Sequence, residues 1–421
     1  MSARREIRFG IIGLGMMGRE FASAAARWCH LLDLDFVPRV TAICSRSASK
    51  FDWFTANFDT IRLAATDYRD LLDPAAVDAV YCAVPHDQHA DLYTDIIVAG
   101  IPLLGEKPFG LDAAANARIL AALGQHPRVF AACVSQFTFY PGAQRVMQAV
   151  QQGTLGRIIE VEAGFLHSSD LDPLKPINWK RRIATNGEYG CMGDLGMHVL
   201  HIPLRAGWAP RTVHARLSNI MTERPDDEGR MVPCETWDNA ILDCTVEAGG
   251  DAFPMTLKLY RIAPGEMNTW YIRVLGTEGG IAFSTKTPRT LYRMAYARGQ
   301  EQSWQQIDLG YRSAYPSITG PIFEFGMPDA LLQMIAAFGD ELVHGRAGMR
   351  QPFHCATPEE TRQQHALLSG ALRSQRERGV VELDYERSAR DPVHDCLRNL
   401  FSRDSASASQ GTPASTGDSA Q

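Results

Sequence analysis

Three residues have side chains suited to proton transfer and to binding an oxygen atom. Lys107 follows a short apolar run and precedes a proline, and a cis bond to Pro108 would aim the lysine from a strand end into a cleft. Asp194 and His198 are four residues apart, so a helix beginning after Gly193 would carry both on one face. Because an imidazole titrates near neutrality, these residues predict an acid/base centre for a reaction at an alcohol carbon.

Each of the three residues also has a structural interpretation. An arbitrary lysine is most often a solvated turn residue. An aspartate at a helix start caps the helix, and a buried histidine is commonly satisfied by a backbone carbonyl. His201 lies three residues beyond His198, but no third ligand of suitable spacing accompanies the pair, so we expect no metal.

A glycine-rich turn near the N-terminus predicts a dinucleotide site. The apolar run at residues 7–12 leads into this turn, and a helical pattern follows it. The first glycine permits the tight turn, the second lets the backbone approach a pyrophosphate, and the third lets the helix pack close to the strand. A glycine-rich turn without a ligand is the alternative. The expected cofactor-binding residues of the turn are Gly13, Gly15, Met16, Met17 and Gly18.

The end of the second strand bears on the choice of cofactor. An acidic residue is expected there to hold the ribose 2′-hydroxyl, but the sequence has Ser45 and Arg46 instead. A cation without a neighbouring carboxylate favours a 2′-phosphate, so NADP is preferred to NAD. Alternatively, Arg46 stacks on the adenine, which suits either cofactor.

The distribution of apolar residues predicts two domains. Residues 1–140 alternate short β-rich runs with helical stretches, which is typical of a Rossmann domain with a doubly wound parallel sheet. Residues 141–385 carry longer segments of period two, which predict a mostly antiparallel, open-faced sheet with one face covered. The expected fold class is therefore α/β plus α+β. Residues 402–421 have almost no large apolar side chain and are expected to form a disordered tail.

Two helices are expected after the second sheet, at residues 329–342 and 359–378. The second has strong end signals: Thr357 as the N-cap, Glu360 completing a capping box, and Gly379 just past the end.

Composition excludes several classes of partner. The net charge of −6 offers no basic surface for nucleic acid or anionic lipid. No apolar run is long enough for a membrane helix, and the N-terminus leads into a strand rather than a signal peptide, so we expect a cytoplasmic protein. The nine cysteines are scattered without a Cys-x-x-Cys pair, which indicates neither a disulfide framework nor a zinc ribbon.

These motifs occur in the order and spacing of a known family. The glycine turn, Pro85 with His89, Glu106-Lys-Pro, Trp179-Lys-Arg181 and the run Asp194-Leu-Gly-Met-His198 together resemble the Gfo/Idh/MocA family of glucose-fructose oxidoreductase, inositol dehydrogenase and rhizopine catabolism proteins. The resemblance is collinear from about residue 6 to residue 385.

The resemblance implies roles for individual residues. His198 would be the principal acid/base, Lys107 would bind and polarise the reacting oxygen, and Asp194 would bind substrate hydroxyls or orient the pair; relatives differ in whether lysine or histidine transfers the proton. His201 stands where relatives often carry aspartate. Residues implied to bind substrate beside the catalytic three are Trp179 and Arg181, although Trp179 in the core and Arg181 as a surface charge are the alternatives. Residues implied to lie along the cofactor are Val84, Pro85, His89, Glu106, Lys107 and Gln136.

The sequence therefore predicts an NAD(P)-dependent dehydrogenase or reductase of a sugar, polyol or related polyhydroxy compound. Two alternatives remain: an NAD-dependent glycosidase acting by transient oxidation and elimination, and a non-enzymatic dinucleotide-binding sugar sensor. Relatives bury the open sheet face between subunits, so a homodimer or homotetramer is expected.

Overall fold

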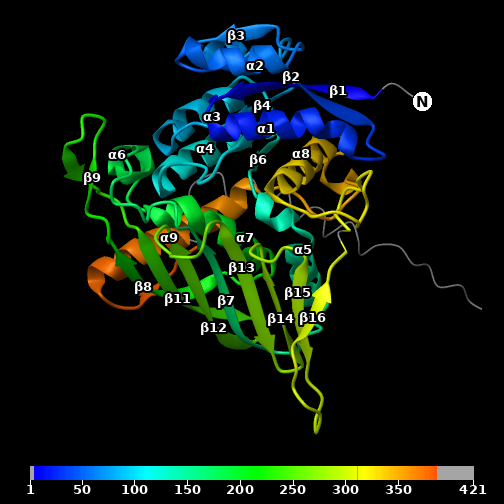
Figure 1. Cartoon of the computed structure of the whole chain (residues 1–421), viewed down its shortest axis with the longest axis vertical. Coiled ribbons are helices and arrows are strands. Elements are labelled where there is room, and N and C mark those ends of the chain that lie inside the picture. Colours follow the sequence, from blue (N-terminus) through cyan, green and yellow to red (C-terminus); the bar gives the residue numbers. More distant parts are fainter. Residues whose placement is uncertain (1–3, 311, 386–421) are drawn as a thin grey trace, which may run out of the picture.

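The computed structural model describes residues 4–310 and 312–385, which form two sheets with helices packed on them (Figure 1). The predicted tail at residues 402–421 lies outside the described residues. The fold class expected from the sequence is confirmed: a parallel sheet forms the N-terminal half, and a mostly antiparallel sheet forms the other. Among the described residues, no helix is both long enough and apolar enough to cross a membrane.

The N-terminal sheet has six parallel strands in the order β3-β2-β1-β4-β5-β6. This is the doubly wound order that leaves a crevice beyond the carboxyl ends of β1 and β4. Strands β3, β5 and β6 have three residues each, which is the lower end of usual strand length. The strands are β1 (Arg5–Ile12), β2 (Phe36–Cys44), β3 (Leu63–Ala65), β4 (Ala79–Cys82), β5 (Leu103–Gly105) and β6 (Ala131–Cys133). The helices of this half are α1 (Met16–Ala26), α2 (Phe51–Asn57), α3 (His89–Val98) and α4 (Ala113–Gln125).

The second sheet has nine strands, in which β7 and β12 are the parallel pair and the other pairs are antiparallel. Alternate residues of its central strands are buried, as the period of two predicts. In sheet order the strands are β16 (Gln305–Asp308), β15 (Thr290–Ala295), β14 (Gly279–Ser284), β13 (Thr269–Gly276), β7 (Ile158–Leu166), β12 (Asp251–Tyr260), β11 (Asn239–Ala248), β8 (Pro210–Ser218) and β17 (Val381–Glu382). A separate small hairpin pairs β9 (Glu223–Pro225) with β10 (Met231–Pro233).

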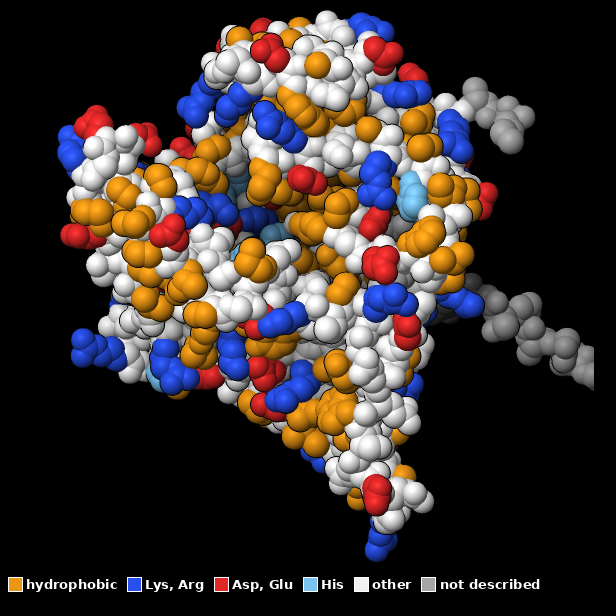
Figure 2. Space-filling view, viewed as in Figure 1, with side chains coloured by type: hydrophobic (Ala, Val, Ile, Leu, Met, Phe, Trp, Pro, Cys, Tyr) orange, Lys and Arg blue, Asp and Glu red, His pale blue; other side chains and the backbone are white. Residues whose placement is uncertain are grey.

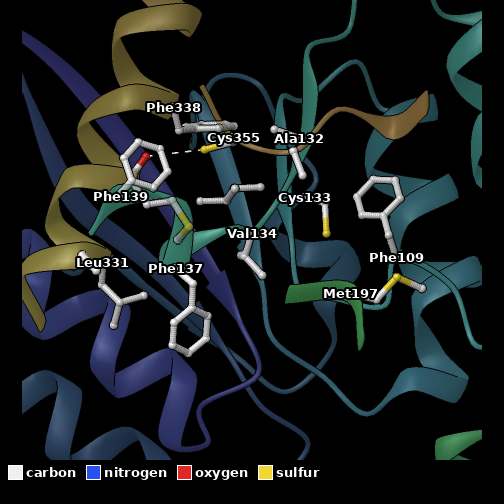
Figure 3. Packing of buried hydrophobic residues seen from close by; sticks show 14 of the residues in the cluster. Phe109, Ala132, Cys133, Val134, Phe137, Phe139, Met197, Leu331, Phe338 and Cys355 are labelled. Carbon is white, nitrogen blue, oxygen red and sulfur yellow. Dashed lines mark hydrogen bonds between the residues drawn. The ribbon is translucent and has the colours of Figure 1, made fainter. Parts of the chain in front are cut away.

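Helices connect the two halves. One face of the second sheet packs against α5 (Pro141–Gln151), α7 (Met197–Arg205) and α9 (Pro358–Glu377). In contrast, α8 (Met327–His344) packs on α1 and β2, so part of the segment assigned to the second domain lies against the first. The short helix α6 (Ile183–Asn186) lies in the loop before α7. Figure 3 shows the shared core, where Phe139 lies near Phe338 of α8.

The ends of α9 differ in part from the prediction. Thr357 is the N-cap, and its side chain accepts from the backbone N–H of Glu360 at 3.1 Å. The predicted capping box is wrong, because the carboxylate of Glu360 binds His201 and Arg205 of α7 instead. The helix ends at Glu377, and Arg378 rather than Gly379 takes the left-handed conformation, with φ of 55°.

Candidate active site

Two glycines of the turn are required by close packing against the backbone, and one leaves open space beside the turn. Gly13 has φ of +97°, and a Cβ there would lie 2.2 Å from the carbonyl oxygen of Ala83. A Cβ on Gly18 would lie 2.3 Å from the carbonyl oxygen of Gly13. A Cβ on Gly15 would meet nothing within 4 Å, and Gly15 caps α1 without a side-chain hydrogen bond. The open backbone and the first N–H groups of α1 thus fit the pyrophosphate of a dinucleotide.

Substitutions at two of these glycines should have different effects, one on cofactor binding and the other on the stability of the fold. We expect Gly15→Ala to weaken NADH binding about tenfold or more, because the added methyl occupies the space left for the phosphates, while the melting temperature stays unchanged. Gly18→Ala should lower the melting temperature, since its methyl meets backbone. Fluorescence titration with NADH and thermal unfolding measure the two effects. A Gly15→Ala protein that unfolds early yet binds NADH normally would contradict the assignment.

Lys107 lies just beyond β5, at the edge of the sheet that carries the glycine turn. Its bond to Pro108 is cis. The Pro108 carbonyl accepts a hydrogen bond from His365 Nε2 of α9 at 2.8 Å. This contact holds the turn that carries Lys107 against α9. The preceding Glu106 is buried and accepts from the Tyr81 hydroxyl at 2.7 Å. Burial raises the pKa of Glu106 despite the nearby Lys107.

Lys107 and Asp194 are in direct contact across the interface of the two halves. Lys107 Nζ donates to Asp194 Oδ1 at 2.6 Å and to the Asp194 carbonyl at 2.9 Å. Lys180 Nζ lies 2.9 Å from Asp194 Oδ2, and Arg261 donates to the same oxygen at 3.1 Å. Burial alone would raise the pKa of Asp194, but these three cations outweigh it and hold the pKa well below its usual range.

Asp194 does not cap a helix. Residues Met192–Gly196 form a π-helical turn that leads into α7, and the carboxylate is engaged by the three cations. The sequence predicted an α-helix at this point; a π-turn is wider and is frequent at functional sites. That Asp194 and His198 act together stays a prediction.

His198 lies on α7 between two aromatic rings. Its ring makes edge contacts with Phe137 and Phe165, with centroids 5.1 and 5.7 Å away. Its backbone carbonyl accepts from Trp270 Nε1 at 3.0 Å, and its Nδ1 is buried with no hydrogen-bond partner among the described residues. Burial, reinforced by the charge of Lys107, holds the pKa of His198 well below 6.5. The imidazole is therefore neutral and able to accept a proton.

Two further buried or partly buried histidines, His86 and His167, were not among the residues predicted for the site. His86 is buried, and its ring lies 4.9 Å from that of Trp179. His167 follows β7 and contacts Phe165. Burial, with a smaller effect of Lys107, lowers the pKa of both. Figure 2 shows a hollow between the two halves in which His and Lys or Arg side chains are visible.

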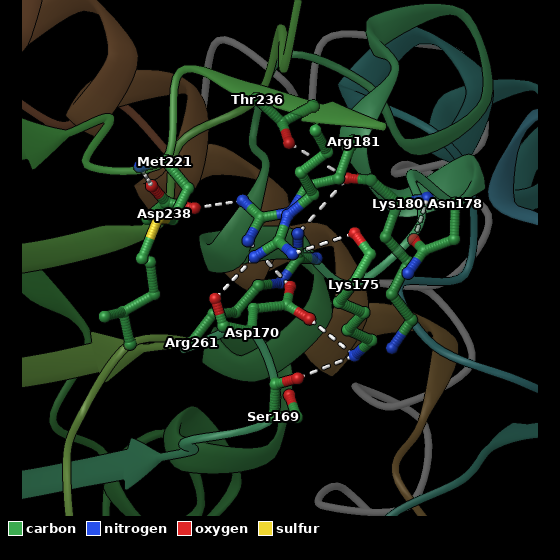
Figure 4. A network of polar contacts seen from close by, with 12 residues as sticks. Ser169, Asp170, Lys175, Asn178, Lys180, Arg181, Met221, Thr236, Asp238 and Arg261 are labelled. Carbon is green, nitrogen blue, oxygen red and sulfur yellow. Dashed lines mark hydrogen bonds and ion pairs between the residues drawn. The ribbon is translucent and has the colours of Figure 1, made fainter. Parts of the chain in front are cut away.

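Arg181 is completely buried, which contradicts both the expected substrate contact and the alternative of a surface charge. Its side chain is fully buried and forms ion pairs with Asp170 and Asp238, as Figure 4 shows. A guanidinium so enclosed between two carboxylates is structural. Trp179 is partly exposed beside His86, where an aromatic contact to a ligand remains a prediction.

Among the residues expected along the cofactor, His89 is a loop anchor. It is completely buried, accepts from Gly110 N at Nδ1, and lies 3.1 Å from the Val84 carbonyl through Nε2. Burial lowers its pKa to about 3, so it stays neutral. It therefore holds Val84 and Pro85 in place rather than contacting a ligand itself. Gln136 is buried, and its Oε1 has no partner among the described residues, which fits a hydrogen bond from a bound cofactor.

His201 is part of the support for α7. It is fully buried, pairs with Glu360 through Nδ1, and lies 3.1 Å from Gln364 Nε2. Gln364 also donates to the Met197 carbonyl at 3.1 Å. These contacts tie α7 to α9 one turn away from His198. Within the described part of the chain, no group of three or more His, Cys, Asp or Glu side chains is placed to hold a metal ion.

Comparison with known proteins agrees with this architecture. The family model described as an oxidoreductase family with an NAD-binding Rossmann fold (GFO_IDH_MocA) matches residues 7–134, and the GFO/IDH/MocA C-terminal domain matches residues 143–282. Levoglucosan dehydrogenase of Pseudarthrobacter phenanthrenivorans is 22% identical over 339 residues, which are 76% of this chain and 82% of that protein. The rhizopine catabolism protein MocA of Rhizobium meliloti is 29% identical over 191 residues, 45% of this chain and 54% of that protein.

A solved structure has the same fold. Levoglucosan dehydrogenase in complex with NADH and levoglucosan superposes with a TM-score of 0.79 at 20% identity, covering 90% of this chain and 100% of that one. The two family models together match more than half of the sequence. The chain therefore belongs to the Gfo/Idh/MocA oxidoreductase family.

Proposed function

We propose that the protein is an NAD(P)-dependent oxidoreductase that transfers a hydride between nicotinamide and a carbon of a sugar, a polyol or a related polyhydroxy compound. One observation carries the proposal: Lys107, beyond the carboxyl end of β5, binds Asp194, which lies four residues before His198 on the chain. Ligands of open α/β sheets bind there. The levoglucosan complex of a structural relative agrees with a sugar substrate.

The chemistry of the site follows from the protonation states. Neutral His198 accepts the proton of the substrate hydroxyl during oxidation and returns it during reduction. The Lys107 ammonium donates a hydrogen bond to the reacting oxygen and stabilises negative charge on it. Asp194 Oδ1 accepts a hydrogen bond from Lys107 Nζ at 2.6 Å and so holds the ammonium in place. A bound nicotinamide supplies the hydride acceptor or donor.

We propose that the cofactor is NAD or NADP, with NADP preferred. Arg46 is exposed after β2, and the backbone N–H of Ser47 donates to the Ser45 hydroxyl at 3.3 Å. This turn offers a cation and hydroxyls at the position where the 2′ group of the adenosine ribose is held in the fold.

The test is turnover of a panel of polyols and aldoses with NAD and with NADP, followed by the absorbance of the reduced nicotinamide. Reduction of the cofactor by at least one neutral or acidic compound is expected. Release of an alcohol from a glycoside without net change in nicotinamide would replace the proposal by the glycosidase alternative. Cofactor binding without any turnover would favour the sensor.

We further propose a homodimer or homotetramer that buries the open face of the second sheet. Helices cover the other face, while this one presents side chains such as Lys258, Tyr271 and Arg273. Lys258 and Arg273 pair there with Glu162. A broad sheet face of this kind is commonly covered by a second subunit. Light scattering that finds only the monomer mass of 46.5 kDa would overturn this proposal.

A further inference from the structure

The substrate side of the site holds more positive than negative charge. Three cations contact the single carboxylate of Asp194. The other nearby aspartates are already paired: Asp170 with Arg181 and Lys175, and Asp238 with Arg181. Glu106 precedes Lys107 in the chain, is buried, and accepts a hydrogen bond from the Tyr81 hydroxyl at 2.7 Å. Asp194 therefore leaves the lysine and arginine charges around it incompletely balanced.

Lys180 is the most accessible of these cations. Its side chain is 38% exposed, compared with 14% for Lys107 and 2% for Arg261. Its ammonium lies 5.8 Å from the centre of the Trp179 ring and 3.0 Å from Asp194 Oδ1. Lys180 thus contacts both the carboxylate that binds Lys107 and the aromatic side chain expected to contact substrate.

The backbone of Lys180 is fixed from behind. The Lys180 carbonyl accepts from the Thr236 hydroxyl at 2.9 Å and from Arg261 at 3.2 Å. Arg261 also binds Asp194, and its Nε is buried with no partner among the described residues. Figure 4 shows this network, in which Arg261 and Arg181 lie beside each other and Lys180 and Lys175 come from one loop. A lysine held in this way is placed to bind a ligand rather than to move freely in solvent.

We propose that Lys180, with Arg261 behind it, binds an anionic group of the substrate, so that the protein acts on acidic polyhydroxy compounds in preference to neutral ones. This inference rests on the proposed function, because it assigns a substrate class to the same site. A carboxylate of a sugar acid and a phosphate of a sugar phosphate share the required chemistry. A hydrogen bond from an ammonium to an anion is strengthened where water is partly excluded.

The test compares kcat/KM for glucose, glucuronate, gluconate and glucose 6-phosphate in the wild-type holoenzyme and in Lys180→Met. We expect kcat/KM for an acidic compound to exceed that for glucose about tenfold or more, and Lys180→Met to lower kcat/KM for the acidic compound about 10- to 100-fold more than it lowers kcat/KM for glucose. A higher kcat/KM for glucuronate or gluconate would identify a carboxylate as the bound anion, and a higher kcat/KM for glucose 6-phosphate would identify a phosphate. Added KCl should weaken the acidic preference in the wild type.

Lys175→Met is the matched control. Lys175 lies in the same loop, is 37% exposed, and pairs with Asp170 rather than Asp194, so its loss should leave the preference unchanged. Lys180→Arg, which keeps the charge, should retain part of the preference, and it serves also if Lys180→Met does not fold. A preference for glucose, or an equal loss for neutral and acidic compounds in Lys180→Met, would overturn the inference and leave the proposed function standing. No turnover of any compound by the wild type would overturn both.

Discussion

Lys107→Met is expected to lower kcat/KM for the best substrate about 10²- to 10³-fold, the usual effect of removing one donor to a developing oxyanion. The ammonium lies 2.6 Å from Asp194, is 14% exposed, and is held on a turn fixed by His365. Methionine keeps the length of the chain and removes the charge. The loss should appear mainly in kcat, because Lys107 acts most strongly on the oxygen as charge develops.

Cofactor binding separates this effect from damage to the fold. The NADH dissociation constant of Lys107→Met should stay within a few-fold of the wild-type value, since the glycine turn is built by β1 and α1. Lys286→Met removes an exposed lysine that pairs with Glu266 and should change neither quantity. Full activity in Lys107→Met would exclude Lys107 from the reaction, and loss of NADH binding would assign it to cofactor binding instead.

The residues found from sequence are those whose roles depend on local pattern. The glycine turn and Lys107 stand directly after strands, so the strand prediction also placed them at the sheet edge. Thr357 caps α9 because an N-cap is a contact within four residues. In the second sheet, alternation of polar and apolar residues identified the strands, whereas the three-residue strands β3 and β6 carried no such pattern.

The roles of residues whose partners are distant in the sequence could not be predicted from local pattern. Arg181 is enclosed by Asp238, 57 residues away, so its burial depends on a contact that no local pattern reveals. Glu360 satisfied the capping-box pattern, yet His201 and Arg205 from another helix bind its carboxylate. Arg261 reaches Asp194 because the end of β12 packs against the π-helical turn Met192–Gly196. Lys180 had one signal, its place between Trp179 and Arg181 in the family motif.

His198→Asn is expected to lower kcat/KM about 10²- to 10⁴-fold, the range for loss of a positioned acid/base. Asparagine keeps a polar side chain between Phe137 and Phe165 but cannot take the proton of the substrate hydroxyl. Initial rates in both directions, with melting temperature as a control, measure the effect. A loss of kcat/KM below about tenfold would indicate that Lys107, rather than His198, transfers the proton.

The pH dependence of the wild type tests the same assignment without a mutation. Burial and the charge of Lys107 hold the pKa of His198 well below 6.5, so the imidazole is already neutral at pH 6.5 and above. The base needed for oxidation is lost only as the pH falls to that depressed pKa. kcat/KM for oxidation should therefore stay level as the pH is lowered from about 8 to about 6, where an unperturbed histidine would become protonated. A decrease in kcat/KM centred near pH 6.5 that persists in His198→Asn would arise from another group. A decrease that disappears in His198→Asn would show that His198 titrates normally and that burial does not shift its pKa.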